Sequence, residues 1–278
     1  MHPVLFHIGS LPVRSYGVVV LIAFLLALAY ATSRVRRDMA GRSPSEPGLI
    51  TPDHVFDMAI IGLFIGILGT RTVYVVLDWP EFAGHPFDAL KIWTGGLSVH
   101  GALLFGVPWV AWYSRRHKLS FLQFTDYCAP AFAIGHGIGR IGCFLNGCCY
   151  GVACNLPWAV RFEREGTYGS LTPPSHPVQL YSAAFNLSFF VLLDRLSRRP
   201  HRRGSITLGY LALFLAGRFV EEIFRKGATA DVFVLGLTHA QAFSLVGIPI
   251  VGLIYLSLRR RAVIDGLPAA DAGAKPAA

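Results

Sequence analysis

The sequence carries little charge. Only 15% of its 278 residues are charged, whereas 53% are hydrophobic and the mean hydropathy is +0.50. An ordinary soluble domain has about 25% charged residues, so this composition excludes a soluble enzyme and favours a membrane protein. Acidic residues are scarcer than basic ones, 16 against 25, but the basic residues lie between apolar runs. We therefore expect a membrane partner and no nucleic-acid partner.

Long apolar runs recur along the chain. Those long enough to cross a hydrocarbon core of about 30 Å cover residues 15–33, 54–77, 97–114, 122–143, 178–196, 204–224 and 239–258. The sequence therefore predicts an all-α, polytopic integral membrane protein with about seven transmembrane helices. We expect one transmembrane domain over residues 1–262, with a small external cap at 144–177, and a disordered cytoplasmic tail at 263–278.

Basic residues mark one side of the membrane. They follow the first, third, fifth and seventh runs, at residues 34–37, 115–118, 195–203 and 259–261. The positive-inside rule then places the N-terminus outside and the C-terminus in the cytoplasm. The first run also resembles a signal-peptide core that ends at Ala31. A signal peptide carries its positive charge before the core, however, and here three arginines follow it, so we expect the run to be retained.

Polar residues lie at one depth in the predicted helices. Each outward-running span carries one arginine near its outer end, and these are Arg71, Arg140 and Arg218. The inward-running spans begin with polar residues at the same level, namely Tyr16, His100, Gln179, and His239 with Gln241. A charge in the apolar region costs at least about 2.5 kcal/mol, so these arginines require anionic partners or water. Glu222 lies one helical turn after Arg218 and is its expected partner.

The other two arginines, Arg71 and Arg140, have no acidic residue one turn away. A guanidinium group can bind a phosphate through two parallel hydrogen bonds, so a phospholipid headgroup in the outer leaflet would satisfy both. The alternative for any one arginine is that it extends to the membrane interface and has no chemical role. That alternative does not explain why every predicted helix contributes a polar group to the same layer.

A glycine-rich segment ends the fourth predicted span, with the sequence GHGIGRIGCFLNGCCYG over residues 135–151. It contains the Gly-x-Gly-x-x-Gly pattern of dinucleotide-binding proteins, but that pattern has meaning only after a strand, and here it ends a membrane helix. We reject it. The segment from Gly139 to Gly151 instead resembles the signature of the prolipoprotein diacylglyceryl transferases. Further segments that resemble motifs of this family are GGLSVHG at 95–101, HPVQLY at 176–181 and RFVEEIFR at 218–225, and the resemblance covers about residues 5–258.

The resemblance implies a transferase that moves the diacylglyceryl group of phosphatidylglycerol to the lipobox cysteine of a prolipoprotein signal peptide. This is the first step of bacterial lipoprotein maturation, and it forms a thioether and releases glycerol phosphate. The resemblance also implies a multi-pass protein of the bacterial inner membrane with its active site facing the outer leaflet. Many family members have Asn and Glu where this chain has Cys143 and Cys148, a tyrosine in place of Phe214, and a Glu in place of Ser182.

The predicted site residues follow from the chemistry of the transfer. A thiol of pKa about 8.5 needs a base, and we predict His100 because imidazole titrates near neutral pH. The alternative for His100 is a structural hydrogen bond in a glycine-rich turn. Arg140 and Arg218 are predicted to bind the phosphate and stabilise its developing charge, so no cofactor and no metal is expected. The predicted substrate-binding residues are Tyr16, Arg71, Asn146, Gly151, Gln179 and Glu222, with His136 and Tyr181 ranked below them.

Four of the five cysteines lie near the outer end of the fourth span, namely Cys143, Cys148, Cys149 and Cys154. Their spacing is compatible with a disulfide, with a zinc site completed by His136 or His176, or with unpaired packing residues.

Two other functions are alternatives to the transferase. One is a catalytically silent phospholipid-binding relative, which the departures from the family pattern keep open. The other is a transporter, which fits less well because the polar layer is confined to the outer half of the predicted helices.

Overall fold

The computed structural model describes residues 3–9, 11–40, 48–92, 95–96, 98–163, 170–225 and 232–264. These residues form eight α-helices, one 3₁₀ helix and two short antiparallel hairpins. The prediction of a helical protein is confirmed, and the hairpins are an addition to it. The chain divides into two compact units, one formed by residues 1–31 and 125–278 and the other by residues 32–124.

Seven long helices coincide with the predicted apolar runs. They are α1 (Ser15–Met39), α2 (Pro52–Leu77), α4 (Val99–Arg116), α5 (Phe121–Asn146), α6 (Val178–Ser197), α7 (Ser205–Glu222) and α8 (His239–Ile264). Four of them, α1, α2, α5 and α8, are long and apolar enough to cross a membrane. Large apolar side chains point outward from these helices, as Phe243 and Leu253 of α8 do, with 72% and 66% of their surface exposed. Hydrocarbon accommodates such a surface, whereas water does not.

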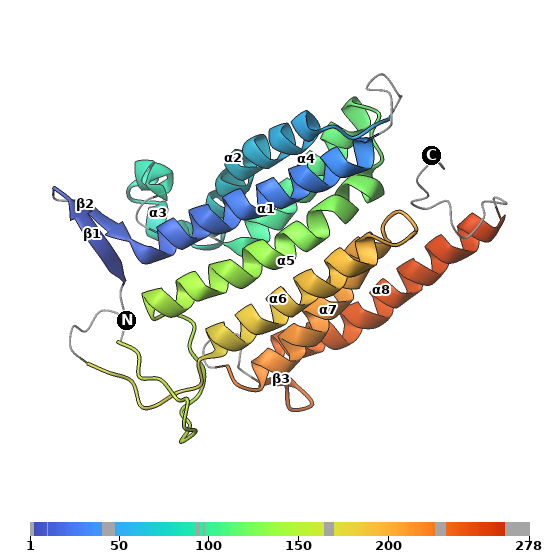
Figure 1. The fold of residues 1–278 in the computed structure, drawn as a ribbon. Helices are drawn as coiled ribbons and strands as arrows, with labels where there is room; N and C mark the ends of the chain where they lie inside the picture. The colour runs from blue at the N-terminus through green and yellow to red at the C-terminus, as the bar shows by residue number, and fades with distance from the viewer. Residues whose placement is uncertain are drawn as a thin grey trace. The chain divides into compact units, whose positions relative to one another are not determined.

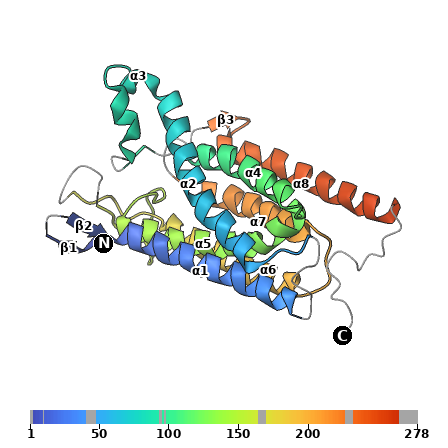
Figure 2. The same cartoon turned by 90° about the horizontal axis from the view of Figure 1, so that it is seen from above.

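The unit of residues 32–124 is built on α2 and α4, which lie side by side (Figure 1). Thr51 caps α2, since its hydroxyl accepts from the His54 amide at 3.4 Å and its own amide donates to the His54 ring at 3.1 Å. Between the two long helices come α3 (Trp79–Phe82) and a 3₁₀ helix (Pro86–Leu90). Figure 2 shows α3 beyond the end of α2. A Cβ atom on Gly101 would overlap the backbone of Gly69, so only glycine allows the two helices to approach this closely.

The other unit contains α6 to α8 and most of α1 and α5, and its helices α6, α7 and α8 run as neighbours (Figure 1). Its core joins α5, α6 and α7 through Ala129, Ala133, Leu193 and Ile206. The Asp126 carboxylate accepts from the Gly204 amide at 2.5 Å and from the Thr207 amide at 2.8 Å, which satisfies backbone donors at the start of α7.

The hairpins and a long loop complete this unit. The first hairpin pairs β1 (Val4–Ile8) with β2 (Leu11–Arg14), and the second pairs β3 (Val232–Val234) with β4 (Leu237–Thr238). The loop from α5 to α6 is held by two backbone hydrogen bonds of 3.0 Å between Val160 and Ser175. Its Phe162 is fully buried and stacks on Tyr150 at a centroid distance of 5.0 Å. The described part of the segment predicted as a cap is therefore packed around Phe162, which also contacts Phe144 of α5.

Candidate active site

The end of α5 sets the geometry of the signature segment. Gly147 has φ +76°, and its amide donates to Phe144 O at 3.1 Å, while the Cys148 amide donates to Cys143 O at 3.2 Å. This is the Schellman arrangement, in which a glycine in the left-handed region ends a helix and its carbonyls are satisfied. Asn146 is the last helical residue and lies beside Cys148. The Asn-Gly pair of the motif is thus a helix stop that turns the chain back over α5.

Arg140 is oriented by a chain of polar side chains in α5 and α6. Its Nε donates to Nε2 of His136 at 3.1 Å. Because that nitrogen accepts, the His136 ring is neutral with its proton on Nδ1, which lies 3.1 Å from the Oδ1 atom of Asn186 and donates to it. Asn186 in turn donates to Ser182 O at 2.9 Å. Within its own unit, Arg140 has no carboxylate partner among the described residues, so its charge is available to a ligand.

Arg218 of α7 forms the ion pair that the sequence predicted. Its Nη2 lies 2.7 Å from a Glu222 carboxylate oxygen, and the Glu222 side chain is fully buried. Arg225 approaches the same oxygen at 3.9 Å. Arg140 and Glu221 are within electrostatic range of Arg218. Among the described residues, this arginine group therefore comprises the guanidinium groups of Arg140, Arg218 and Arg225 and the carboxylates of Glu221 and Glu222, with one net positive charge.

Gln179 and Gly151 hold the loop against the helices. Gln179 is 1% exposed, and its Nε2 donates to Cys148 O at 2.6 Å, which ties α6 to the turn after α5. The Gly151 amide donates to His176 O at 2.9 Å. A Cβ atom on Gly151 would overlap Phe224 O, so this position requires glycine for close packing. Both residues were predicted to bind substrate, and in the structure both make contacts within the protein that hold the loop in place.

Tyr16 lies at the start of α1, beside the end of α5. Its ring would be 3.3 Å from a Cβ atom on Gly142, and it is within electrostatic range of Arg140. The phenol is 43% exposed, so it remains accessible to a ligand. The structure thus brings Tyr16, Arg140, Asn146, Gln179, Arg218 and Glu222 into one unit.

Arg71 has polar partners that the sequence analysis, which considered acidic residues one turn away and a lipid phosphate, did not identify. It is 6% exposed, and its guanidinium donates four hydrogen bonds of 2.7–3.1 Å. The acceptors are the backbone carbonyls of Asp88, Ala89, Gly95 and Gly96. The same group lies over the rings of Phe82 and Tyr74, at 5.3 and 5.7 Å from their centroids. The side chain is therefore occupied in organising the segment between α2 and α4.

His100 stands in the first turn of α4, in the same unit as Arg71, and is exposed. Its Nδ1 lies 3.4 Å from the hydroxyl oxygen of Ser98, whose amide donates to Thr70 O at 3.0 Å. Through this contact and the close approach of Gly101 to Gly69, the His100 backbone is held beside the turn of α2 that carries Arg71. The second ring nitrogen has no partner among the described residues of this unit.

An apolar pocket of about 430 Å³ lies beside the arginine group. Its lining residues are Leu156, Trp158, His176, Tyr181, Ala184, Phe185, Glu221 and Phe224. Trp158 Nε1 donates to the Tyr181 hydroxyl at 2.8 Å, and that oxygen lies 3.2 Å from His176 Nδ1. Glu221 belongs both to this pocket and to the surroundings of Arg218. Sequence reasoning ranked Tyr181 low and did not identify the pocket, because its walls come from three separate segments.

These features together define a class, namely a helical membrane protein with a cationic group at its helix ends beside an apolar pocket. A family model described as prolipoprotein diacylglyceryl transferase matches residues 3–258. The chain therefore belongs to the prolipoprotein diacylglyceryl transferase family, which confirms the resemblance seen in its motifs.

Similar proteins from distant bacteria support this assignment. A phosphatidylglycerol–prolipoprotein diacylglyceryl transferase of Photobacterium profundum is 35% identical over 81% of this chain and 80% of its own length. One of Clostridium tetani is 32% identical over 94% of this chain and 98% of its own length. One of a Nostoc species is 31% identical over 96% of this chain and 94% of its own length. The similarity thus covers at least four fifths of each protein.

Proposed function

We propose that this chain transfers the diacylglyceryl group of phosphatidylglycerol to the lipobox cysteine of a prolipoprotein. The relatives named for this activity match over most of their length, which supports the same substrate pair here. In the proposed reaction the cysteine sulfur attacks the glyceryl carbon that bears the phosphate. A carbon–sulfur bond forms, the carbon–oxygen bond to the phosphate breaks, and glycerol phosphate leaves with the bonding electrons.

The proposed topology has seven spans in one transmembrane domain, with the N-terminus outside and the C-terminus in the cytoplasm. The positions of the seven long helices support it, as do the basic segments at the C-terminal ends of α1, α4, α6 and α8. In this arrangement the residues 144–177 form an external cap and the arginine group lies near the outer leaflet of the bacterial inner membrane. The predicted tail begins at 263, and its residues beyond 264 lie outside the described residues.

One observation carries the proposal at the level of residues. Arg140 has an open guanidinium face beside the Arg218–Glu222 pair, so a lipid phosphate is the ligand that would balance the remaining positive charge. As the phosphate leaves, negative charge grows on its oxygens, and fixed donors in an apolar surrounding stabilise that change most strongly. Arg140 and Arg218 are therefore the proposed phosphate-binding residues, and Tyr16 and Asn146 are proposed to orient the headgroup.

His100 is the proposed base that takes the proton from the incoming thiol. Its exposed ring supports this role, since a substrate thiol must reach it. Arg71 is proposed to act through His100, because its four carbonyl contacts shape the segment that leads into α4. Gln179, Gly151 and Glu222 are likewise proposed as positioning residues rather than direct ligands. The apolar pocket beside Glu221 offers a place for part of an acyl chain.

A purified-protein assay tests the reaction itself. The full chain in detergent is mixed with phosphatidylglycerol and a synthetic lipobox peptide, and the peptide mass is followed. The expected product is the peptide carrying one diacylglyceryl group on cysteine, with no product from a peptide that has serine at that position. A chain that binds phosphatidylglycerol but yields no product under these conditions is a silent relative, and the proposal is then wrong.

A further inference from the structure

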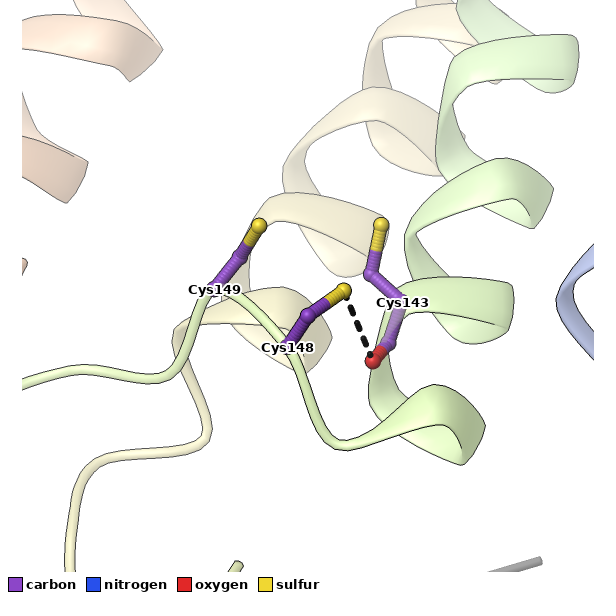
Figure 3. A group of neighbouring side chains, drawn as sticks. All are labelled: Cys143, Cys148 and Cys149. Atoms are coloured by element: carbon purple, nitrogen blue, oxygen red, sulfur yellow. Dashed lines mark hydrogen bonds between the residues drawn. The ribbon is translucent and has the colours of Figure 1, made fainter. Parts of the chain in front are cut away.

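Three thiols meet at the end of α5, apart from the groups used in the proposed reaction. All five cysteines lie among the described residues, and each has a free thiol. The Sγ atoms of Cys143, Cys148 and Cys149 all lie within 4.8 Å of one another. Figure 3 shows the three side chains directing their sulfur atoms into the same space, Cys143 from α5 and the other two from the loop. Cys128 and Cys154 do not belong to this cluster.

The helix stop explains why the cluster forms. In a Schellman arrangement the third residue before the cap and the second residue after it come into contact, and here these are Cys143 and Cys148. The Cys148 sulfur lies 3.7 Å from Cys143 O. Cys149 follows with φ +61°, in the left-handed region that non-glycine residues rarely adopt. This backbone conformation turns its sulfur back toward the other two.

We propose that Cys143, Cys148 and Cys149 form a binding site for one thiophilic metal ion of the Zn²⁺ class. Zinc binds thiolate sulfur at about 2.3 Å, so three sulfurs around one tetrahedral ion lie about 3.8 Å apart. The observed limit of 4.8 Å is about 1 Å wider, a difference that side-chain rotation closes. Soft sulfur ligands select zinc or copper(I) over magnesium or calcium.

Two arginines lie near the cluster. Arg140 and Arg225 lie within electrostatic range of Cys149. Three thiolates around a divalent ion carry one net negative charge, which nearby guanidinium groups attract. Each thiol loses its proton when the ion binds. A water molecule takes the fourth position, as in zinc sites with three protein ligands.

The site is distinct from the proposed chemistry, because the substrate supplies the reacting thiol and the arginines supply the phosphate contacts. Binding of a metal ion would nevertheless fix the loop that carries Cys148, whose backbone carbonyl accepts a hydrogen bond from Gln179. An ion here would therefore stiffen the junction of α5 with the cap, next to Arg140 in the same helix.

Metal titration of the reduced full chain in detergent tests the proposal, with Co²⁺ as a spectroscopic probe and Zn²⁺ as competitor. We expect a sulfur-to-cobalt charge-transfer band that saturates at one equivalent per chain and disappears when Zn²⁺ is added. Each of Cys143→Ser, Cys148→Ser and Cys149→Ser should lose most of this band. Cys154→Ser is the matched control, since it alters a neighbouring loop cysteine outside the cluster, and it should keep the band.

A second measurement needs no variant. In the wild-type chain, Zn²⁺ should protect Cys143, Cys148 and Cys149 from alkylation and leave Cys154 reactive, as mapped by peptide mass. The proposal is overturned if no band appears at one equivalent, if Cys154→Ser loses it as fully as the other variants, or if Zn²⁺ leaves the three cluster thiols as reactive as before. None of these outcomes depends on transferase activity, so the proposed function stands or falls separately.

Discussion

The Arg71→Ala substitution tests whether this side chain organises the segment before α4 or contacts lipid directly. Its four hydrogen bonds of 2.7–3.1 Å reach the carbonyls of Asp88, Ala89, Gly95 and Gly96. A hydrogen bond that involves a charged group contributes about 1.5–3 kcal/mol. The four contributions are not additive, and water reaches these half-buried or exposed positions after the substitution, so we expect a local loss of about 3–5 kcal/mol.

Hydrogen exchange in detergent without lipid measures this loss. The amides of His85, Asp88 and Lys91 donate to backbone carbonyls within the segment and report its opening. A loss of about 3 kcal/mol corresponds to exchange faster by about 100-fold in Arg71→Ala. Arg71→Lys should recover little of the protection, because an ammonium group lacks the planar fork that spans four carbonyls.

Lys91→Ala is the control, since it removes an exposed ion pair with Asp88 in the same segment and should change the exchange of the His85 amide little. If Arg71→Ala exchanged as slowly as the wild type, the organising role would be refuted and direct lipid contact would regain support.

Other predictions address the helix contact, the loop and the chemistry. Gly101→Ala should lower the thermal midpoint in a melting experiment, because its methyl group overlaps the Gly69 backbone and overpacking costs about 1–3 kcal/mol; an unchanged midpoint would contradict the close approach. Gln179→Ala should destabilise the chain by about 1–3 kcal/mol in the same measurement, since it leaves the carbonyl of Cys148 without its donor, and equal stability would argue against that contact. His100→Ala should abolish transfer while membrane insertion, measured by fractionation, is retained. If the thiolate is the reacting species, the transfer rate should rise between about pH 6 and pH 8, and a flat profile would exclude that requirement.

The sequence predicted the long helices well for a simple physical reason. Only an unbroken helix satisfies its backbone inside hydrocarbon, so long apolar runs leave little choice of structure. The ends of α2 and α6 accordingly match the predicted runs to within two residues. The Arg218–Glu222 ion pair could also be predicted from the sequence, because residues one helical turn apart lie on the same face of a helix.

Contacts between residues far apart in the chain could not be predicted in the same way. The partners of Arg71 are backbone carbonyls 17 to 25 residues away. Since every residue has a backbone carbonyl, the sequence does not indicate which ones accept a hydrogen bond. His136 was ranked low because its role, accepting from Arg140 one turn later in α5 and donating to Asn186 in another helix, depends on how α5 and α6 pack. The sequence analysis noticed the four cysteines near the end of α5, but which three of them meet depends on the left-handed conformations of Gly147 and Cys149.

The steady-state kinetics of Arg140→Ala, measured with phosphatidylglycerol and a lipobox peptide, test the central claim that this arginine holds the lipid phosphate during transfer. Removing one preorganised donor to a developing negative charge costs about 10²–10³-fold in rate, and we expect a loss of that size in kcat/KM, partly restored in Arg140→Lys. Arg161→Ala, which removes an exposed arginine of the loop, should keep wild-type kinetics. Wild-type kcat/KM in a folded Arg140→Ala protein would contradict the account.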